Sequence, residues 1–239
     1  PFRETARLTV NGEVPLRFRV PGWCRKFEVR DCGRTLASSE KGGGWVEVRN
    51  ARDGATLEIA MQAETTWRHY SRNGGVSLER GPLTYSLAVP AETRRVPHPS
   101  FTRSGSPVWP EPGRDGTIAD PMTEMTMKPG FAWNYGLSSG STAIEFRRRA
   151  WTDDCFTAEN APCEVFVKAR RIPEWTLQDN QPAALQEGPA YTEEPEETIR
   201  LIPLGCARLR LSVFPTASSD PNAVRWRKVP AKTLRKDRK

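Results

Sequence analysis

Carboxylates in pairs are the side chains of this sequence best suited to acid–base chemistry. Two runs contain them: Asp153-Asp154 and the Glu-Glu-Pro-Glu-Glu run at 193–197. Successive side chains of a strand point to opposite faces, so neighbours in sequence do not form a facing catalytic pair. Both runs lie beside turn signals, and we interpret them as solvated turns.

His69 is the next candidate, and it lies among aromatic residues without a partner that could orient it as a base. A structural role is therefore favoured. The sequence contains no glycine-rich phosphate loop, no GxSxG elbow and no HExxH helix. These observations predict no catalytic residue in the chain.

The cysteines form no CxxC pair, and only His69 and His98 could add imidazole ligands to them. An odd number is also unusual for a disulfide framework; the five stand at positions 24, 32, 155, 163 and 206. Two pairings, 24 with 32 and 155 with 163, require strands to bring the partners together. Buried free thiols are the favoured alternative, because cysteine is a common small core residue. We predict no metal-binding and no cofactor-binding residue.

The chain is rich in tryptophan, which can stack on the apolar faces of sugars or fill the core of a small β domain. There are eight, at 23, 45, 67, 109, 133, 151, 175 and 226. Core packing is favoured for any single one. Trp109 and Trp133 are the candidate sugar contacts.

The elements that position these residues show a period of two, with glycine-rich turns between them and no convincing helical period. Strands are predicted at 6–10, 15–20, 26–32, 45–49, 55–61, 76–80, 83–89, 142–148, 163–169, 198–203 and 206–214. The pattern predicts an all-β chain with two antiparallel, jelly-roll-like β-sandwich domains. The expected domains are residues 1–91 and 134–217.

Residues 92–133 interrupt this pattern with seven prolines and little apolar periodicity. A loop of that length is either a disordered linker or an arm laid across a surface. The bulky side chains of Trp109, Phe131 and Trp133 favour an arm. A weak signal also suggests a short helix near 121–125.

The net charge of +7 is concentrated at the C-terminus, since eight basic residues and one acid lie in 225–239. A disordered tail is expected over 218–239, and the balanced remainder predicts no specific binding of nucleic acid. No apolar run is long enough to cross a bilayer, and no membrane association is expected. The first residues lack both Met and a signal peptide, so we expect a fragment of a longer protein. Its localisation stays open between the bacterial cytoplasm and secretion.

Six segments of the sequence, taken in their order along the chain, resemble segments of one protein family. They are PLRFRVPGWC (15–24), GGWVEVRNARDGATLEIAM (43–61), LERGPLTYSLAV (78–89), FAWNYGL (131–137), VKARRIPEWTL (167–177) and LIPLGCARLRLSVFP (201–215). Together they resemble the C-terminal half of glycoside hydrolase family 127, the β-L-arabinofuranosidase-like enzymes. The resemblance spans nearly all of residues 1–216.

The resemblance implies β-sandwich domains that follow a catalytic (α/α)6 barrel. It also implies that the catalytic cysteine and a zinc ion lie in that barrel, which is absent from this sequence, so no catalytic or metal residue is carried over. The expected function is non-catalytic: the chain supports the barrel, and the fragment alone is inactive. The expected partners are the barrel and glycans of plant or glycoprotein origin.

Two alternatives remain open at this stage: a self-standing carbohydrate-binding module, and an interaction protein with a basic tail. Trp23 bears on the first of them. It follows Pro21-Gly22 at a tight corner between two predicted strands, and we interpret it as a packing wedge that closes this corner, not as a sugar contact.

Overall fold

The computed structural model describes six stretches of the chain: residues 2–97, 100–102, 104–109, 122–139, 143–178 and 181–228. Within them the regular elements are strands, apart from one 3-10 turn at Leu204–Cys206. Most strand pairs are antiparallel. The predicted all-β class is confirmed, whereas the finer expectation of two jelly-roll sandwiches stays a prediction.

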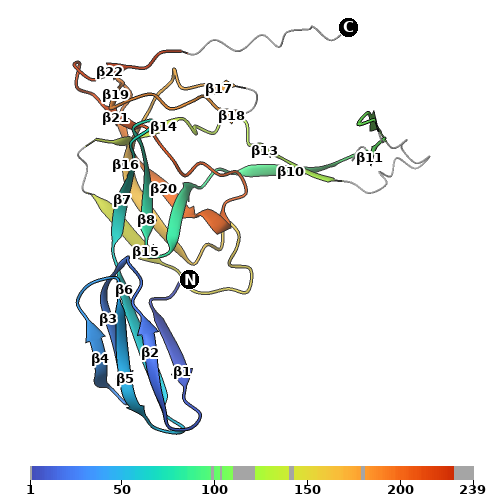
Figure 1. Cartoon of the computed structure of the whole chain (residues 1–239). Coiled ribbons are helices and arrows are strands. Elements are labelled where there is room, and N and C mark those ends of the chain that lie inside the picture. The colour runs from blue at the N-terminus through green and yellow to red at the C-terminus, as the bar shows by residue number, and fades with distance from the viewer. Residues whose placement is uncertain are drawn as a thin grey trace.

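The first six strands form what we call the N-terminal unit, at the bottom of Figure 1. One sheet has the order β1 (Thr5–Thr9), β6 (Thr56–Ala63), β3 (Cys24–Asp31) and β4 (Arg34–Ser39); the other pairs β2 (Val14–Arg19) with β5 (Trp45–Ala51). Val46 and Val48 of the small sheet share one core with Val29 and Leu57 of the larger sheet. The alternation of apolar and polar side chains along each strand produces this arrangement, because one face is buried and the other is solvated.

The remaining body is built on one large sheet. Its main path runs β22 (Val224–Arg225), β19 (Ala190–Tyr191), β21 (Thr216–Ser218), β14 (Tyr135–Ser138), β16 (Cys163–Arg171), β20 (Glu196–Pro203), β9 (Leu83–Leu87), β8 (Gly75–Arg80) and β7 (Thr65–Tyr70), and β15 (Ile144–Arg148) pairs with β16. Strand β16 alternates buried and half-buried residues over its length, so one of its faces lies in the core.

The chain passes from the N-terminal unit to the large sheet between β6 and β7, whereas the sequence analysis placed the end of its first domain at residue 91. Strands β7, β8 and β9 therefore belong with the later strands, because β9 pairs with β20 across more than one hundred residues of sequence. Periodicity indicates which residues form strands, but it carries no information about which distant strand completes the ladder.

The described parts of the proline-rich segment form ribbons that project away from the body (Figure 1), and Trp109 is exposed instead of covering a surface. The root of this segment pairs β10 (Ala91–Val96) with β13 (Met122–Met127), and its outer part pairs β11 (Ser100–Phe101) with β12 (Pro107–Val108). The short helix suggested at 121–125 is wrong for residues 122–125, which are extended, because they form a ladder with β10. A further short ribbon pairs β17 (Leu177–Gln178) with β18 (Gln181–Pro182).

The strand predicted at 206–214 is also wrong. Residues 204–206 form the 3-10 turn, and the following segment contacts the large sheet only at separate points. Leu211 accepts a hydrogen bond from the amide of Leu87 at 2.8 Å, and Phe214 exchanges two hydrogen bonds with Val76, each of 2.8 Å. The alternation of Leu209, Leu211 and Val213 is real, but the backbone makes too few consecutive pairs for a strand.

The tail expected at 218–239 is wrong for residues 218–228, which the structure describes. Ser218 ends β21, Val224–Arg225 forms β22 beside β19, and Trp226 is 8% exposed. The reason is the indole of Trp226, whose burial against Trp175 offsets the basic character of its neighbours. Residues 229–239, which contain most of the basic cluster, lie outside the described part of the chain.

Candidate functional site

The two candidate sugar contacts lie in different surroundings. Trp109 follows β12 on the outer part of the proline-rich segment and is 61% exposed. Trp133 is half-buried, and its ring lies 5.1 Å from that of Trp175 at an interplanar angle of 58°. Trp133 therefore packs in the body, while Trp109 is free to contact a ligand or partner. Their assignment as sugar contacts stays a prediction.

A set of interacting polar and aromatic groups lies where the N-terminal unit meets the large sheet. We call this region the junction and define it by Glu4, Trp23, Arg80, Tyr85, Phe146, Arg148 and Cys163. Six of these seven side chains line one small cavity of about 90 Å³, and the seventh, Arg148, contacts two of them. The residues come from both units, so the junction determines how the units are held together.

Glu4, just before β1, is the electrostatic centre of the junction. Its Oε1 lies 2.7 Å from Arg80 of β8 and 3.1 Å from Arg148 of β15. The Arg80 guanidinium also lies over the ring of Phe146, 4.1 Å from the centroid. The side chains of Glu4 and Arg80 are 25% and 18% exposed, so water screens this pair less than a surface pair.

Trp23 contacts both units. It packs on the core of the N-terminal unit, beside the tilted pair Phe18 and Phe27. On its other side, two of its ring carbons lie 3.5 Å from where a Cβ would stand on Gly81, in the turn between β8 and β9. Gly81 has φ +57°, which also favours glycine. Trp23 therefore packs between the two units, whereas the sequence analysis expected it to close a strand corner.

Tyr85 and Cys163 form the buried end of the junction, with the Tyr85 hydroxyl 3.4 Å from the Cys163 sulfur. Burial raises the pKa of the Tyr85 hydroxyl, and the contact with Cys163 raises it further. Burial also raises the pKa of the Cys163 thiol, against the opposing effects of Tyr85 and of the Arg148 and Arg80 charges. Both groups are therefore neutral at physiological pH, which suits packing and not nucleophilic attack.

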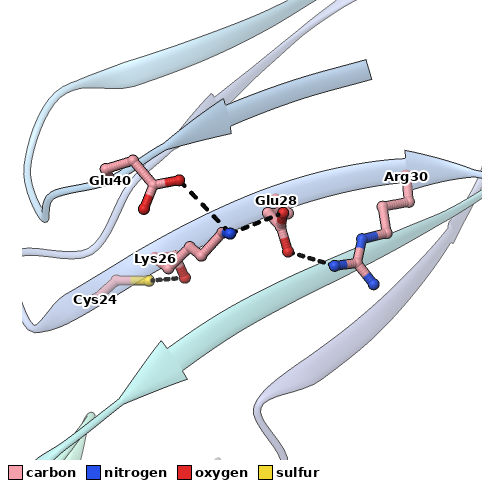
Figure 2. Close-up of polar contacts among 5 residues, drawn as sticks. All are labelled: Cys24, Lys26, Glu28, Arg30 and Glu40. Carbon is pink, nitrogen blue, oxygen red and sulfur yellow. Dashed lines mark hydrogen bonds and ion pairs between the residues drawn. The ribbon is translucent and has the colours of Figure 1, made fainter. Parts of the chain in front are cut away.

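A second polar set runs along the solvated face of β3, where Glu28 lies between two cations (Figure 2). Lys26 Nζ is 3.4 Å and Arg30 Nη2 is 2.5 Å from the Glu28 carboxylate, and Lys26 also contacts Glu40 at 3.6 Å. Burial acts to raise the pKa of Glu28, but the hydrogen bonds from Arg30 and Lys26 outweigh it and lower the pKa. These residues alternate with buried core residues, so the set stabilises a charged sheet face.

The chemistry available within the described residues is limited. None of the five sulfurs forms a disulfide; Cys32 alone among them is exposed, and the Cys24 thiol donates to the backbone oxygen of Lys26 at 3.0 Å. Over the described stretches, no group of three or more His, Cys, Asp or Glu side chains could hold a metal ion. No helix within those stretches is long and apolar enough to span a membrane.

The carboxylates considered from sequence are not gathered into one site. Asp153-Asp154 lies in an exposed turn between β15 and β16. The 193–197 run begins in the loop after β19 and ends in β20, where Glu197 accepts a hydrogen bond from Tyr135 at 3.1 Å. His69 lies on β7 and is exposed, and His98 falls outside the described residues.

Comparison with known proteins gives no matching family model and no matching curated protein. Solved structures do match, and three of them are described here. The chain resembles glycoside hydrolases of family 127. One match is a GH127 β-L-arabinofuranosidase from Geobacillus stearothermophilus T6, with 18% identity over 90% of this chain and 28% of that one, and a TM-score of 0.48.

The second match is a GH127 β-arabinofuranosidase, BT3674, with 14% identity over 90% of this chain and 30% of that one, and a TM-score of 0.47. The third is described as a glycoside hydrolase, with 18% identity over 91% of this chain and 31% of that one, and a TM-score of 0.42. The resemblance predicted from six sequence segments is confirmed as a resemblance. This chain spans less than a third of the length of each matched protein.

Sequence reasoning missed the charged members of the junction. Glu4, Arg80 and Arg148 each have charged neighbours in the sequence, so nothing in the pattern distinguishes them. Two residues carried a signal. Gly81 stands between two predicted strands, where a glycine indicates a tight turn. Trp23 is a large aromatic side chain that is expected to pack against another surface.

Proposed function

We propose that this chain is the non-catalytic β portion of a glycoside hydrolase resembling the β-L-arabinofuranosidases, and that it supports a catalytic (α/α)6 barrel. The junction is the observation that supports this role. A supporting domain must hold its partner in a fixed orientation, and the junction joins two β units into one body through charge, aromatic packing and a glycine turn.

The junction resists movement of one unit against the other for a physical reason. Separating the units would leave Glu4 without Arg80 and Arg148 and would expose the Trp23 ring that covers Gly81. Losing partly buried charge-assisted hydrogen bonds and aromatic contacts is unfavourable. The chain is therefore a stiff platform, and a stiff platform is the useful property of a support.

The implied partner is the barrel, and the implied substrates of the whole protein are glycans with terminal β-L-arabinofuranosyl residues. The six segments of the sequence support this family assignment, and they fall on strands and turns of both units. The catalytic cysteine and zinc of such an enzyme would belong to the barrel. This chain would contribute a surface and no reacting group.

A direct test is to follow the reading frame on either side of this sequence and to express any adjoining barrel as a separate polypeptide. We expect the barrel and this chain to co-purify in a 1:1 complex, as measured by light scattering. A barrel that is fully soluble and active while showing no binding to this chain at about 10 µM would contradict the proposal.

A further inference from the structure

A groove of about 550 Å³ lies at the end of the large sheet far from the N-terminal unit, near β19 and β22 at the top of Figure 1. Its lining combines two aromatic residues, three carboxylates and one arginine: Tyr191, Trp226, Glu174, Glu193, Glu194 and Arg225. The volume is in the range of small-molecule sites. Tyr191 and Arg225 are partners in the β19–β22 ladder, but neither this ladder nor the junction accounts for the three carboxylates beside them.

Trp226 is more than nine-tenths buried, and its indole N–H is the key polar group of the groove. The side chain is 8% exposed, and its ring packs 5.9 Å from that of Trp175. The Trp175 N–H donates to the backbone oxygen of Ala183 at 2.9 Å, whereas the Trp226 N–H has no acceptor in the described part of the chain. It is not among the enclosed unsatisfied polar atoms either, so this N–H is open to solvent on a side chain that lines the groove.

The carboxylates of the groove have capacity to accept more hydrogen bonds. Glu193 accepts one hydrogen bond, from the Tyr191 hydroxyl at 2.9 Å, through one of its two oxygens. Within the described residues, neither Glu174 nor Glu194 makes an ion pair or a side-chain hydrogen bond. The Arg225 guanidinium lies over the Tyr191 ring, 5.0 Å from the centroid, so this aromatic face is already occupied by a cation.

The chemistry of a ligand follows from this inventory by elimination. A cationic group brings only donors and would leave the Trp226 N–H unpaired. An anionic group would accept from the indole but would meet a net negative lining, because the three carboxylates outnumber the single guanidinium of Arg225. A hydroxyl both donates to a carboxylate and accepts from an indole N–H, and several hydroxyls on one frame satisfy all these groups together.

We propose that this groove binds a neutral saccharide, with the Trp226 N–H donating to one hydroxyl and with Glu174, Glu193 and Glu194 accepting from others. The proposal goes beyond the supporting role above and does not depend on it, because the groove lies at the opposite end of the large sheet from the junction. It adds a glycan contact remote from any catalytic centre.

The indole N–H signals in a ¹H–¹⁵N spectrum of the full chain test the proposal directly. The probes are four neutral trisaccharides, namely arabinotriose, xylotriose, galactotriose and mannotriose, with trigalacturonic acid as the acidic comparator. Trp226→Phe removes one signal and thereby assigns it. We expect this signal to shift saturably with at least one neutral probe, and to be unmoved by the acidic one.

Variants separate the groove from the rest of the surface. Trp226→Phe keeps an aromatic ring, although a smaller one, and loses the donor. Glu174→Ala removes a carboxylate that makes no side-chain hydrogen bond to the described chain. Each should weaken binding about tenfold, as expected for one lost hydrogen bond. Trp151→Phe, at a 50% exposed tryptophan outside the groove lining, is the matched control and should bind as wild type.

Three results would overturn the proposal. One is a Trp226 signal that does not shift with any of the four neutral probes at about 10 mM, a concentration above the Kd of even a weak saccharide site. Another is an equal shift with trigalacturonic acid. The last is wild-type affinity in both Trp226→Phe and Glu174→Ala, with folding of the variants verified from the remaining indole signals.

Discussion

Glu4 and Arg80 are 76 positions apart in sequence and form an ion pair of 2.7 Å across the junction. Arg148 contacts the same carboxylate oxygen at 3.1 Å, so one acid before β1 links β8 and β15. Because each partner comes from a different part of the chain, this contact exists only when the N-terminal unit and the large sheet are docked. Its removal therefore measures the docking itself.

Glu4→Gln should lower the free energy of unfolding by about 1–3 kcal/mol, because two partly buried arginines lose their common counter-charge. Glu145→Gln is the matched control, since the Glu145–Arg147 pair is 57% and 53% exposed and exposed pairs contribute about 0–1 kcal/mol. Urea unfolding of both variants makes the comparison. Equal losses would mean that the junction pair has no special weight.

Trp23→Ala should cost about 2–4 kcal/mol, less than a fully buried tryptophan, because the ring is half-buried between two units. Trp45→Ala is the control, since Trp45 is 54% exposed and the Arg17 guanidinium lies over its ring, 4.7 Å from the centroid. We expect the control to cost less than about 1 kcal/mol. If the two variants unfold at the same urea concentration, Trp23 is not a wedge.

A chain that ends at Arg225 should be about 3 kcal/mol less stable than one that ends at Lys228, because only the longer form keeps the buried indole of Trp226. Thermal unfolding of the two truncated chains gives the difference. Indistinguishable melting temperatures would show that the packing of Trp226 on Trp175 adds nothing to stability.

The free energy of unfolding should fall in alkali because of the buried residue Cys206. Its thiol donates a hydrogen bond to the backbone oxygen of Cys155 at 3.2 Å. Burial raises the pKa of Cys206 to about 11 from an ordinary value of 9.0. Below pH 9 both the folded and unfolded states keep the proton; above it the unfolded state ionises first, so stability is lost progressively toward pH 11.

Cys206→Ala should accordingly flatten the dependence of unfolding free energy on pH between 9 and 11. Cys32→Ala, in an exposed turn, is the control and should retain the wild-type slope. A Cys206→Ala profile that falls as steeply as wild type over this interval would assign the loss to other groups.

The sequence predicts local structure well and long-range pairing poorly. The alternation in β3, β5 and β6 gave both the strands and their buried faces, because that pattern is a property of each strand alone. Membership of β7–β9 in the large sheet depends on β20, over one hundred residues away, and no local pattern encodes it. At 206–214 the alternation correctly indicated that Leu209 and Leu211 pack against the core, but the backbone does not form the predicted strand.

The candidate site follows the same rule. Trp23 could be singled out because a large ring beside Pro21-Gly22 is unusual, and its role as a wedge followed from its apolar neighbours. Glu4 and Arg80 could not, since their partnership is made by the docking of two units. The groove at Trp226 was missed because composition assigned residues 218–239 to a basic tail, and one buried tryptophan outweighs several charges.

The central claim is that this chain supports catalysis without performing it. The most direct measurement is the release of aryl alcohol from an aryl β-L-arabinofuranoside by the purified chain, with zinc and a thiol reductant present. The account predicts no release above a mock purification from cells that lack the chain, and release by a longer product that includes an adjoining barrel. Turnover by the chain alone that survives the mock control would contradict the account.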